Sequence, residues 1–287
     1  MTIRSLIEGG TRCISFEYFP PRTEKGEVNL FKTIRSMKEL EPGFVSITCG
    51  AGGSTRHRTV EWADRIKNEV GIEVVVHMTC LGMDRAELES ELSEVRARGL
   101  ENILALRGDP PLDDPSHAVR DGECRFAIDL VRVIGESYPE ACMIGACHPE
   151  GHVDGAGLAA DLQRLREKCD AGVDVLITQL FFDNRHYFDF VSRARATGIE
   201  QPIVPGIMPV TNLGQLEKFT KMCGATIPPR LLDKLQACGD DKEAVLSVGV
   251  EHATAQCRDL IDRGAPGIHF YTLNKSPATR LIVQNLN

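Results

Sequence analysis

A charged residue lies within the first apolar run of the sequence. This residue is Glu17, between Phe16 and Tyr18. Burying a carboxyl group between aromatic side chains is costly without a partner, and enzymes use a carboxyl group in such surroundings as a general acid. The alternative is a structural ion pair with Arg22. Glu17 is therefore the first candidate for acid–base chemistry.

Polar residues also follow the other apolar runs of the sequence. In chain order they are Thr48, His77 and Thr79, Arg107-Gly108-Asp109, His148, Glu150 and His152, Thr178-Gln179, Pro205-Gly206, and Tyr271-Thr272. If the runs are parallel strands, their carboxyl ends meet at one rim, where a substrate site is expected. The shared position is a stronger argument than any single residue.

Each candidate also has a structural explanation when it is taken alone. Thr48 could satisfy a strand-end amide, and His77 could be a hydrogen-bonded core histidine. Asp109, before two prolines, could be a turn residue. Gln179 could be structural, and Lys168 could be a solvated charge on a helix. The sequence leaves these alternatives open.

The elements that must position these residues alternate along the chain. We expect strands at Cys13–Phe19, Phe44–Thr48, Glu73–Met78, Asn102–Leu106, Ala141–Ala146, Asp174–Leu180, Ile203–Pro205 and Gly267–Tyr271. Their continuous hydrophobicity is typical of strands that are covered on both faces. We expect helices at Glu27–Leu40, Arg58–Val70, Asp84–Arg98, Arg125–Ser137, Leu158–Ala171, Asn184–Thr197, Asn212–Cys223, Lys242–Arg263 and Lys275–Leu286, with a helical insertion at Pro228–Cys238.

Eight strands that are each followed by a helix predict an α/β fold, a single closed (β/α)8 TIM barrel. No shift in composition marks a linker, so residues 1–287 are expected to form one domain. The alternative is an open doubly wound sheet, but no G-x-G-x-x-G follows any expected strand. The glycines of Gly50–Gly53 have the wrong spacing for that fingerprint and indicate a loop.

Composition restricts the classes of function. A formal net charge of −8 repels phosphate backbones, so we expect no nucleic-acid partner. The chain shows neither a signal peptide nor a run of ~20 apolar residues, which predicts a cytoplasmic protein without a membrane partner. The ten cysteines form no C-x-x-C pair or zinc-finger spacing, so we expect free thiols and no metal.

Six blocks of this sequence, in order, resemble the methylenetetrahydrofolate reductase family. They are Ser15–Arg22, His77–Cys80, Leu106–Pro110, Ile177–Phe182, Pro205–Pro209 and His269–Asn274. The resemblance runs from about residue 13 to the end and is closest to the short bacterial form. It implies a barrel that binds FAD at its carboxyl rim. It also implies that NADH or NADPH reduces the flavin, which then reduces 5,10-methylenetetrahydrofolate to 5-methyltetrahydrofolate in a ping-pong reaction. Family members are commonly homo-oligomers, which implies the same here.

The resemblance also assigns roles by position. Glu17 matches the general acid that protonates N10 of the folate, and Asp109 matches the aspartate that tunes both half-reactions beside the flavin and the pterin. Gln179 matches an amide that recognises pterin and nicotinamide. The flavin-contacting positions are Thr48, His77, Arg107, Gly108, Asp109, Phe126, Ala127, His148, His152, Asp161 and Lys168. The substrate-side positions, besides Glu17 and Gln179, are Gln215, Phe219 and Lys275.

The sequence departs from the family pattern after the fifth expected strand. His148 stands where the family commonly has tyrosine, and Asp154 stands where glutamate is usual. Either change could alter flavin affinity or position. Two other classes of function stay open as alternatives. A barrel lyase would usually need a strand-end lysine, which is absent from the expected strand ends, and a non-catalytic folate-binding subunit would not need Glu17.

Overall fold

The computed structural model describes residues 1–10, 13–21, 23–50, 55–110, 122–275 and 277–286. Two segments considered above, Arg22 and residues 51–53, lie outside the described residues. The strands are β1 (Cys13–Tyr18), β2 (Phe44–Ile47), β3 (Val74–Thr79), β4 (Asn102–Leu106), β5 (Cys142–Cys147), β6 (Val175–Thr178), β7 (Ile203–Val204), β8 (Gly206–Ile207) and β9 (Gly267–Tyr271).

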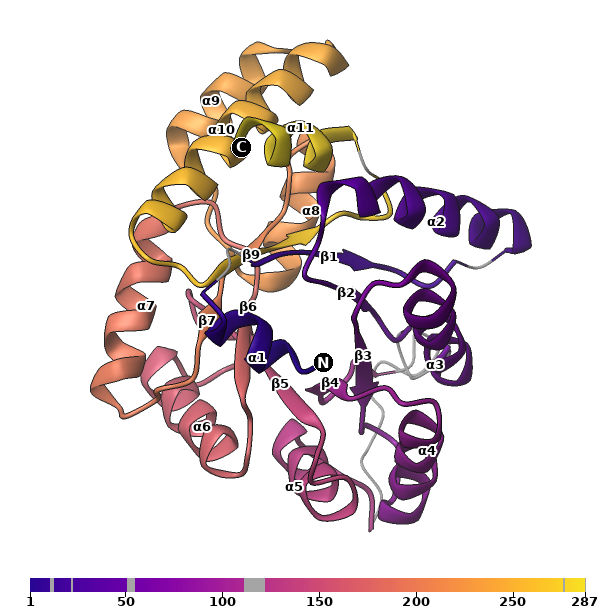
Figure 1. Cartoon of the computed structure of the whole chain (residues 1–287). Helices are drawn as coiled ribbons and strands as arrows, with labels where there is room; N and C mark the ends of the chain where they lie inside the picture. The colour runs from indigo at the N-terminus through magenta and orange to yellow at the C-terminus, as the bar shows by residue number, and fades with distance from the viewer. Residues whose placement is uncertain (11–12, 22, 51–54, 111–121, 276, 287) are drawn as a thin grey trace.

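Most of the helices lie around the outside of the ring of strands, and α1 lies across one end of it (Figure 1). The helices are α1 (Ile3–Glu8), α2 (Glu24–Met37), α3 (Arg56–Arg65), α4 (Arg85–Ala97), α5 (Ala127–Ser137), α6 (Leu158–Asp170), α7 (Asn184–Ala196), α8 (Leu213–Cys223), α9 (Pro229–Ala237), α10 (Lys242–Asp262) and α11 (Pro277–Leu286). A 3₁₀ turn at Lys38–Leu40 extends α2, and a π-helical turn at Ile66–Val70 extends α3.

All neighbouring strands pair in parallel, in the order β7-β6-β5-β4-β3-β2-β1-β9-β8. Because β7 pairs with β6 and β8 pairs with β9, the chain from Ile203 to Ile207 closes the ring. The predicted (β/α)8 barrel is therefore confirmed. The expected single strand at Ile203–Pro205 is wrong in detail. Pro205 has no N–H to donate to a ladder, and it separates two short strands.

Helix α4 shows how local sequence sets these elements. The Asp84 carboxylate accepts a hydrogen bond from the Glu87 N–H, and the Glu87 carboxylate accepts one from the Asp84 N–H, both at 2.9 Å. This capping box satisfies backbone donors that would otherwise lack partners. Leu88, Leu92 and Val95 then fall on one buried face at helical spacing.

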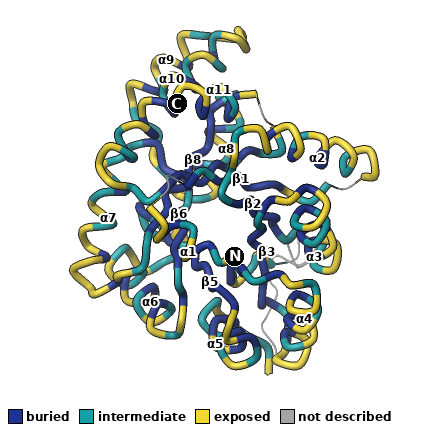
Figure 2. The backbone as a smooth tube through the Cα atoms, viewed as in Figure 1, coloured by how far each residue is buried: buried dark blue, intermediate teal, exposed yellow. Residues whose placement is uncertain are grey.

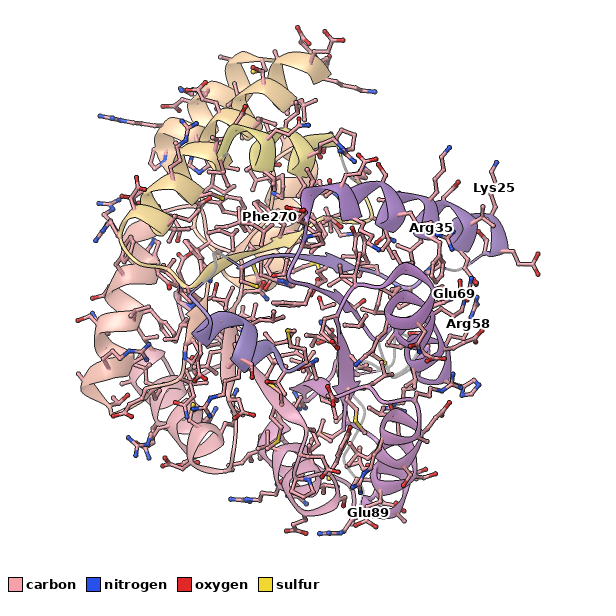
Figure 3. The ribbon with its side chains drawn as sticks, viewed as in Figure 1. Lys25, Arg35, Arg58, Glu69, Glu89 and Phe270 are labelled. Carbon is pink, nitrogen blue, oxygen red and sulfur yellow. The ribbon has the colours of Figure 1, made fainter. Side chains whose placement is uncertain are left out.

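Two apolar layers hold the barrel together. The larger one lies between the strands and the outer helices and includes Phe270, which is labelled in Figure 3. In contrast, the labelled charges Lys25, Arg35, Arg58 and Glu69 lie on the outer surface of α2, α3 and the turn after α3. Figure 2 shows the same division, with buried strands inside and exposed helix faces outside.

The second apolar layer fills the amino-terminal half of the barrel, where α1 covers it. Helix α1, which the sequence did not predict, places Ile3 and Ile7 against the inward side chains of the strands. The Ile3 N–H donates to Asn102 Oδ1 at 2.8 Å, and Arg4 pairs with Asp174 at 3.1 Å. Figure 1 shows α1 lying across this end of the ring. The amino-terminal end of the barrel is therefore filled by apolar side chains, and the candidate polar residues lie at the opposite, carboxyl end.

Candidate active site at the carboxyl rim of the barrel

Glu17 lies at the end of β1, and its side chain is buried among polar groups inside the barrel. Its Oε2 is 3.5 Å from Nε2 of His77 on β3 and 3.9 Å from Nε2 of His269 on β9. Glu17 as a whole is 7% exposed, His77 5% and His269 1%. Three strands that are far apart in sequence thus bring one carboxyl group and two imidazoles together. We call these three residues the Glu17 centre.

Hydrogen bonds fix the histidine of β9. Its Nδ1 is 2.8 Å from Ser15 Oγ, and its Nε2 is 3.4 Å from Ser46 Oγ. The ring stacks on Phe44, with centroids 5.7 Å apart. His269 is therefore held on both edges and one face. His77 differs, because its Nε2 has no hydrogen-bond partner among the described residues.

The pKa of His77 shows which effect dominates in this centre. Burial lowers the pKa of His77 to about 4, although the nearby Glu17 carboxylate acts in the opposite direction. Burial is the larger effect because a charged imidazolium loses its hydration there. His77 is therefore neutral at neutral pH and does not form a charged pair with Glu17.

The loop after β9 fixes the backbone at the end of β1. Thr272 Oγ1 donates to the Glu17 carbonyl at 2.6 Å. The Asn274 side-chain amide donates to the Phe19 carbonyl at 2.9 Å and accepts from the Phe19 N–H at 2.8 Å. Asn274 has φ of +59°, a conformation that asparagine tolerates better than most residues. The loop thus determines where Glu17 lies.

A cavity of about 460 Å³ lies over the ends of β4 and β5. It lies between the start of α5, the loop after β5 and the inner side of α6. We call it the β5 cavity. Seven of the expected flavin-contacting residues line it: Arg107, Phe126, Ala127, His148, His152, Asp161 and Lys168. Arg164, Asp154 and Gly155, which were not among the expected contacts, also line it.

Two basic groups in the β5 cavity, Lys168 and His148, are largely withdrawn from water, whereas Arg107 and Arg164 are exposed. Burial lowers the pKa of the Lys168 ammonium, which donates to the Ala146 carbonyl at 2.9 Å. Burial, together with the neighbouring His152 and Lys168, lowers the pKa of His148 to about 4. The Asp161 carboxylate accepts the His152 backbone N–H at 2.7 Å, which fixes the loop. The cavity therefore combines a lysine whose charged form is disfavoured by burial with the neutral imidazole of His148.

The remaining expected flavin contacts lie next to this cavity or deeper in the barrel. Gly108 and Asp109 directly follow Arg107 at the rim, and Asp109 is exposed. Gly108 has φ of +87°, and a Cβ there would lie 2.8 Å from Thr79 Cβ. Thr48 is buried at the end of β2, where its N–H donates to the Tyr18 carbonyl.

A second cavity at the rim, about 550 Å³, lies over β9. We call it the β9 cavity. It is lined by Pro209, Thr211, Asn212, Gln215, Lys242, Leu246, Tyr271, Thr272, Leu273, Lys275, Pro277, Ala278 and Thr279. It contains two expected substrate-side residues, Gln215 and Lys275. It also adjoins the Glu17 centre, because Thr272, which lines it, donates to the Glu17 carbonyl.

The other two substrate-side residues do not line this cavity. Phe219 packs, partly buried, on an apolar cluster that includes Leu180 and Leu216. The Gln179 side-chain oxygen accepts the N–H of Leu180 at 2.9 Å, and its backbone N–H donates to Cys147. The structure thus brings Gln215 and Lys275 together in one cavity, whereas Gln179 and Phe219 are not among its lining residues.

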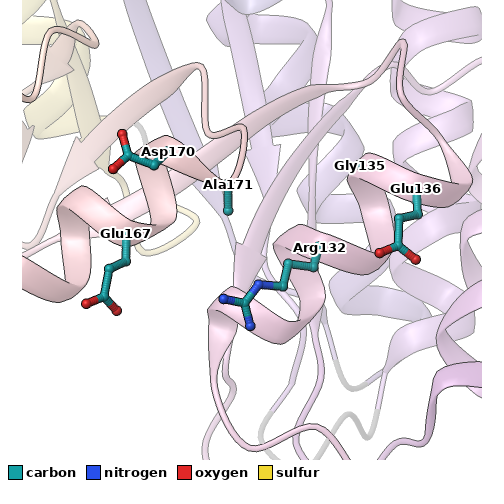
Figure 4. A pocket seen from close by; sticks show the side chains of 6 residues that line it. All are labelled: Arg132, Gly135, Glu136, Glu167, Asp170 and Ala171. Atoms are coloured by element: carbon teal, nitrogen blue, oxygen red, sulfur yellow. The ribbon is translucent and has the colours of Figure 1, made fainter.

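A third hollow is distant from this chemistry. It lies between α5 and α6 and is lined by Arg132, Gly135, Glu136, Glu167, Asp170 and Ala171 (Figure 4). Five of these six residues belong to the last turns of the two helices or follow them directly, at the end of the barrel where the strands begin. Active sites of such barrels lie at the opposite end.

Comparison with known proteins agrees with this geometry. The family model described as methylenetetrahydrofolate reductase matches residues 2–287. The chain belongs to the methylenetetrahydrofolate reductase family. The 5,10-methylenetetrahydrofolate reductase of Pectobacterium carotovorum subsp. carotovorum is 36% identical over 95% of this chain and 89% of its own length.

Plant and animal relatives are longer. Methylenetetrahydrofolate reductase (NADH) 1 of Arabidopsis thaliana is 38% identical over 99% of this chain and 50% of its own length. A probable methylenetetrahydrofolate reductase (NADPH) of Caenorhabditis elegans is 35% identical over 99% of this chain and 43% of its own length. This chain thus spans about half the length of the plant proteins that it matches.

A solved structure supports the fold. A Clostridium thermocellum protein, described as binding two copies of 5-methyl-5,6,7,8-tetrahydrofolic acid, superposes with a TM-score of 0.65. The superposition covers 100% of this chain and 98% of that protein, at 14% sequence identity.

In this family member, sequence reasoning missed several side chains of the site. His269, Ser15 and Ser46 look like ordinary strand residues, because their spacing does not show that they face one another inside a closed barrel. Each does point inward, since Ser15 and Glu17 alternate on β1. Counting inward positions on β9 from Tyr271 would have found His269.

Two other features are absent from the described ranges. No cluster of three or more histidine, cysteine, aspartate or glutamate residues there is arranged to hold a metal ion. No helix in that part of the chain is both long and apolar enough to cross a membrane.

Proposed function

We propose that this chain reduces 5,10-methylenetetrahydrofolate to 5-methyltetrahydrofolate, with FAD as cofactor and NADH or NADPH as the electron donor. The observation that carries the proposal is the buried Glu17 carboxyl group at the carboxyl rim, in a chain of the methylenetetrahydrofolate reductase family. We propose further that residues 1–287 act as one catalytic domain, in the cytoplasm, and as a homo-oligomer. Nucleic acid and membrane lie outside this proposal.

The residues of the β5 cavity fit a flavin dinucleotide. Arg107, Arg164 and Lys168 give the cavity cationic groups that suit a pyrophosphate. The buried Lys168 ammonium gains most from such an anion, because burial without one is costly. Phe126 is 59% exposed at the cavity edge, although it is a large apolar side chain, and it offers a stacking surface. His148, neutral at neutral pH, can stack and hydrogen-bond in place of the family tyrosine.

Bound FAD would accept hydride from the nicotinamide and pass it to the folate. The chain must then supply the proton. The methylene carbon of the folate is bridged between two nitrogens and accepts hydride poorly until protonation of N10 opens the ring. Glu17 is the buried acid that we assign to this step. His77 is neutral at neutral pH and so does not form an ion pair with the Glu17 carboxyl group, although the two side chains are 3.5 Å apart. We therefore assign the carboxyl group of Glu17 as the proton donor.

The remaining residues orient the two substrates in turn. Asp109, exposed at the rim, would favour the cationic folate that forms on protonation. The amide of Gln179 can donate and accept, which suits both pterin and nicotinamide. In the β9 cavity, Gln215 and Lys275 would hold the outer part of the folate, with Phe219 nearby. One site that serves two substrates in succession gives ping-pong kinetics.

The test is the Glu17→Gln variant, examined in each half-reaction separately. Glutamine keeps the shape of the side chain but cannot donate a carboxylic proton. We expect NADH to bleach the flavin absorbance at a normal rate, while folate reduction falls by about 10²–10⁴. Normal rates in both half-reactions would remove Glu17 from the mechanism. A purified protein that neither binds added FAD nor oxidises NADH would overturn the proposed function itself.

A further inference from the structure

The loop between β5 and α6 contains a largely buried carboxylate that does not face the β5 cavity. We call residues 148–157 the β5 loop. Four residues of this loop line the cavity: His148, His152, Asp154 and Gly155. Glu150 belongs to the same loop but is not among the lining residues, and only 11% of its side chain is exposed. A carboxylate so withdrawn from water is costly unless it is paired, so its partners indicate its role.

The partners of Glu150 come from two other parts of the barrel. Its two carboxylate oxygens lie 3.2 and 3.1 Å from the backbone nitrogen of Thr226 and accept the N–H there. Thr226 belongs to residues 224–228, which we call the α8–α9 connection. Oε2 of Glu150 also lies 3.5 Å from Nε2 of His186 on α7. A hydrogen bond to a carboxylate is stronger than one between neutral groups. Glu150 therefore joins the β5 loop firmly to a segment 76 positions later in the chain.

A tight turn connects Glu150 to the side chains that line the cavity. The Gly151 N–H donates to the His148 carbonyl at 3.0 Å, so Glu150 lies inside a turn that begins at His148. Gly151 has φ of +90°, which glycine adopts without strain. His148 and His152 flank Glu150 in sequence, and their rings meet edge to face with centroids 4.8 Å apart. A displacement of Glu150 would therefore move both imidazoles of the cavity wall.

The β5 loop and the α8–α9 connection also meet at a second point. Gly224, the residue after α8, approaches Val153 so closely that a Cβ at Gly224 would lie 3.7 Å from Val153 Cβ. This contact is apolar and has no preferred direction, so it does not fix the orientation of the loop. The contact with His186 is an ion pair only when the imidazole is protonated. The hydrogen bond from Thr226 to Glu150 is directional and needs no protonated partner, and it therefore serves as the anchor.

We propose that Glu150 is a positioning residue for the cofactor. Its hydrogen bond with Thr226 holds the β5 loop against the α8–α9 connection, and this keeps His148 and His152 in place for the flavin dinucleotide. Glu150 acts through these two histidines and does not line the cavity itself. Without the hydrogen bond, the cofactor must order the loop as it binds, and that cost lowers its affinity. The inference rests on the proposed function, because it takes FAD as the ligand of the β5 cavity.

The experiment is a titration of the full chain with FAD, followed by flavin fluorescence, after circular dichroism has shown that each variant is folded. Glu150→Ala should raise the Kd for FAD about three- to tenfold, the effect of one net hydrogen bond. Thr226→Pro removes the donor N–H from the other side and should raise the Kd to a similar extent. Glu150→Gln keeps an oxygen that can accept the N–H and should restore most of the affinity. At saturating FAD the bound cofactor itself orders the loop, so the kcat for NADH oxidation should match that of the parent in all three variants.

The matched control is Glu217→Ala on α8, because Glu217 is exposed and lines neither rim cavity. It removes the same charge and should leave the Kd for FAD unchanged. An unchanged Kd in Glu150→Ala would overturn the inference but leave the proposed function standing, whereas a parent that binds no FAD would count against the proposed function itself. The inference would also be wrong if Glu150→Gln bound FAD as weakly as Glu150→Ala, since charge and not the hydrogen bond would then be the cause. A fall in kcat at saturating FAD as large as the loss of affinity would place Glu150 in the chemical step and overturn the positioning role.

Discussion

His77 makes a testable contribution to the pH dependence of stability. In the unfolded chain its pKa is the ordinary value near 6.5, and in the folded protein burial lowers it to about 4. Above pH 6.5 both states carry neutral imidazole. As the pH falls below 6.5, only the unfolded state takes up a proton, so stability is lost until the pH passes the folded pKa.

The size of this loss follows from the two pKa values. Each pH unit between them corresponds to about 1.4 kcal/mol, so His77 accounts for about 3 kcal/mol over the whole interval and about 2 kcal/mol between pH 7.5 and pH 5. Carboxylates elsewhere in the chain also titrate in acid, so the pH dependence of the parent's stability alone does not give the contribution of His77. The His77→Gln variant has a side chain of similar polarity that does not titrate. Subtracting its profile isolates the histidine.

The assay is urea unfolding followed by circular dichroism, at a series of pH values from 7.5 to 4.5. The substitution will lower the free energy of unfolding by some constant amount. We expect the gap between parent and variant to shrink by about 2 kcal/mol from pH 7.5 to pH 5. A gap that does not change with pH would refute the reasoning, because it would mean that His77 titrates equally in both states. A gap that widens in acid would mean that Glu17 outweighs burial.

Three further outcomes follow from the same contacts. Gly108→Ala should lower the free energy of unfolding by about 1–3 kcal/mol in the same urea assay, because φ there is +87° and the new Cβ would meet Thr79. Thr272→Val should lower the free energy of unfolding by about 1–3 kcal/mol, because the buried Glu17 carbonyl loses the hydroxyl that donates to it. Thr272→Ser keeps the hydroxyl, so an equal loss of stability in that variant would show that the hydrogen bond is not the cause. Lys168→Met should weaken FAD binding by at least tenfold in a flavin-fluorescence titration while leaving the chain folded, and unchanged affinity would exclude Lys168 from the cofactor site.

The order of elements could be predicted from the sequence because each strand and helix carries its own periodicity. Helix α1 could not, because its short apolar pair, Ile3 and Ile7, is buried only by the closed end of the barrel. The interruption at Pro205 was visible in the sequence. Its consequence was not, since pairing of the flanking residues with β6 and β9 depends on the ring being closed.

The residues of the β5 cavity could be predicted from the sequence better than those of the Glu17 centre, for a related reason. The β5 cavity draws on the ends of consecutive strands and the helices after them, so residues that follow strands in sequence meet there in space. The Glu17 centre depends on inward positions of β1, β3 and β9, and the two histidines lie within 4 Å of Glu17 because the first and last strands of the chain pair in a curved sheet. Phe219 packs, partly buried, against an apolar cluster that Tyr271 and Leu273 of the β9 cavity also contact, and its substrate-side role stays a prediction.

Gly206, the first residue of β8, contributes both to closure of the barrel and to the geometry of the active site. A Cβ at this position would lie 2.4 Å from the Thr178 carbonyl oxygen and 2.6–2.7 Å from the Tyr271 ring and hydroxyl. The Tyr271 hydroxyl donates to that same carbonyl at 2.5 Å, and burial holds the pKa of Tyr271 well above its ordinary value, so the donor is retained at neutral pH. Only glycine lets β8 approach β9 closely while this tyrosine fills the space beside them. The residue that allows the last pair of strands to join is therefore also the one that leaves room for Tyr271, which lines the β9 cavity and packs edge-on against His269 of the Glu17 centre.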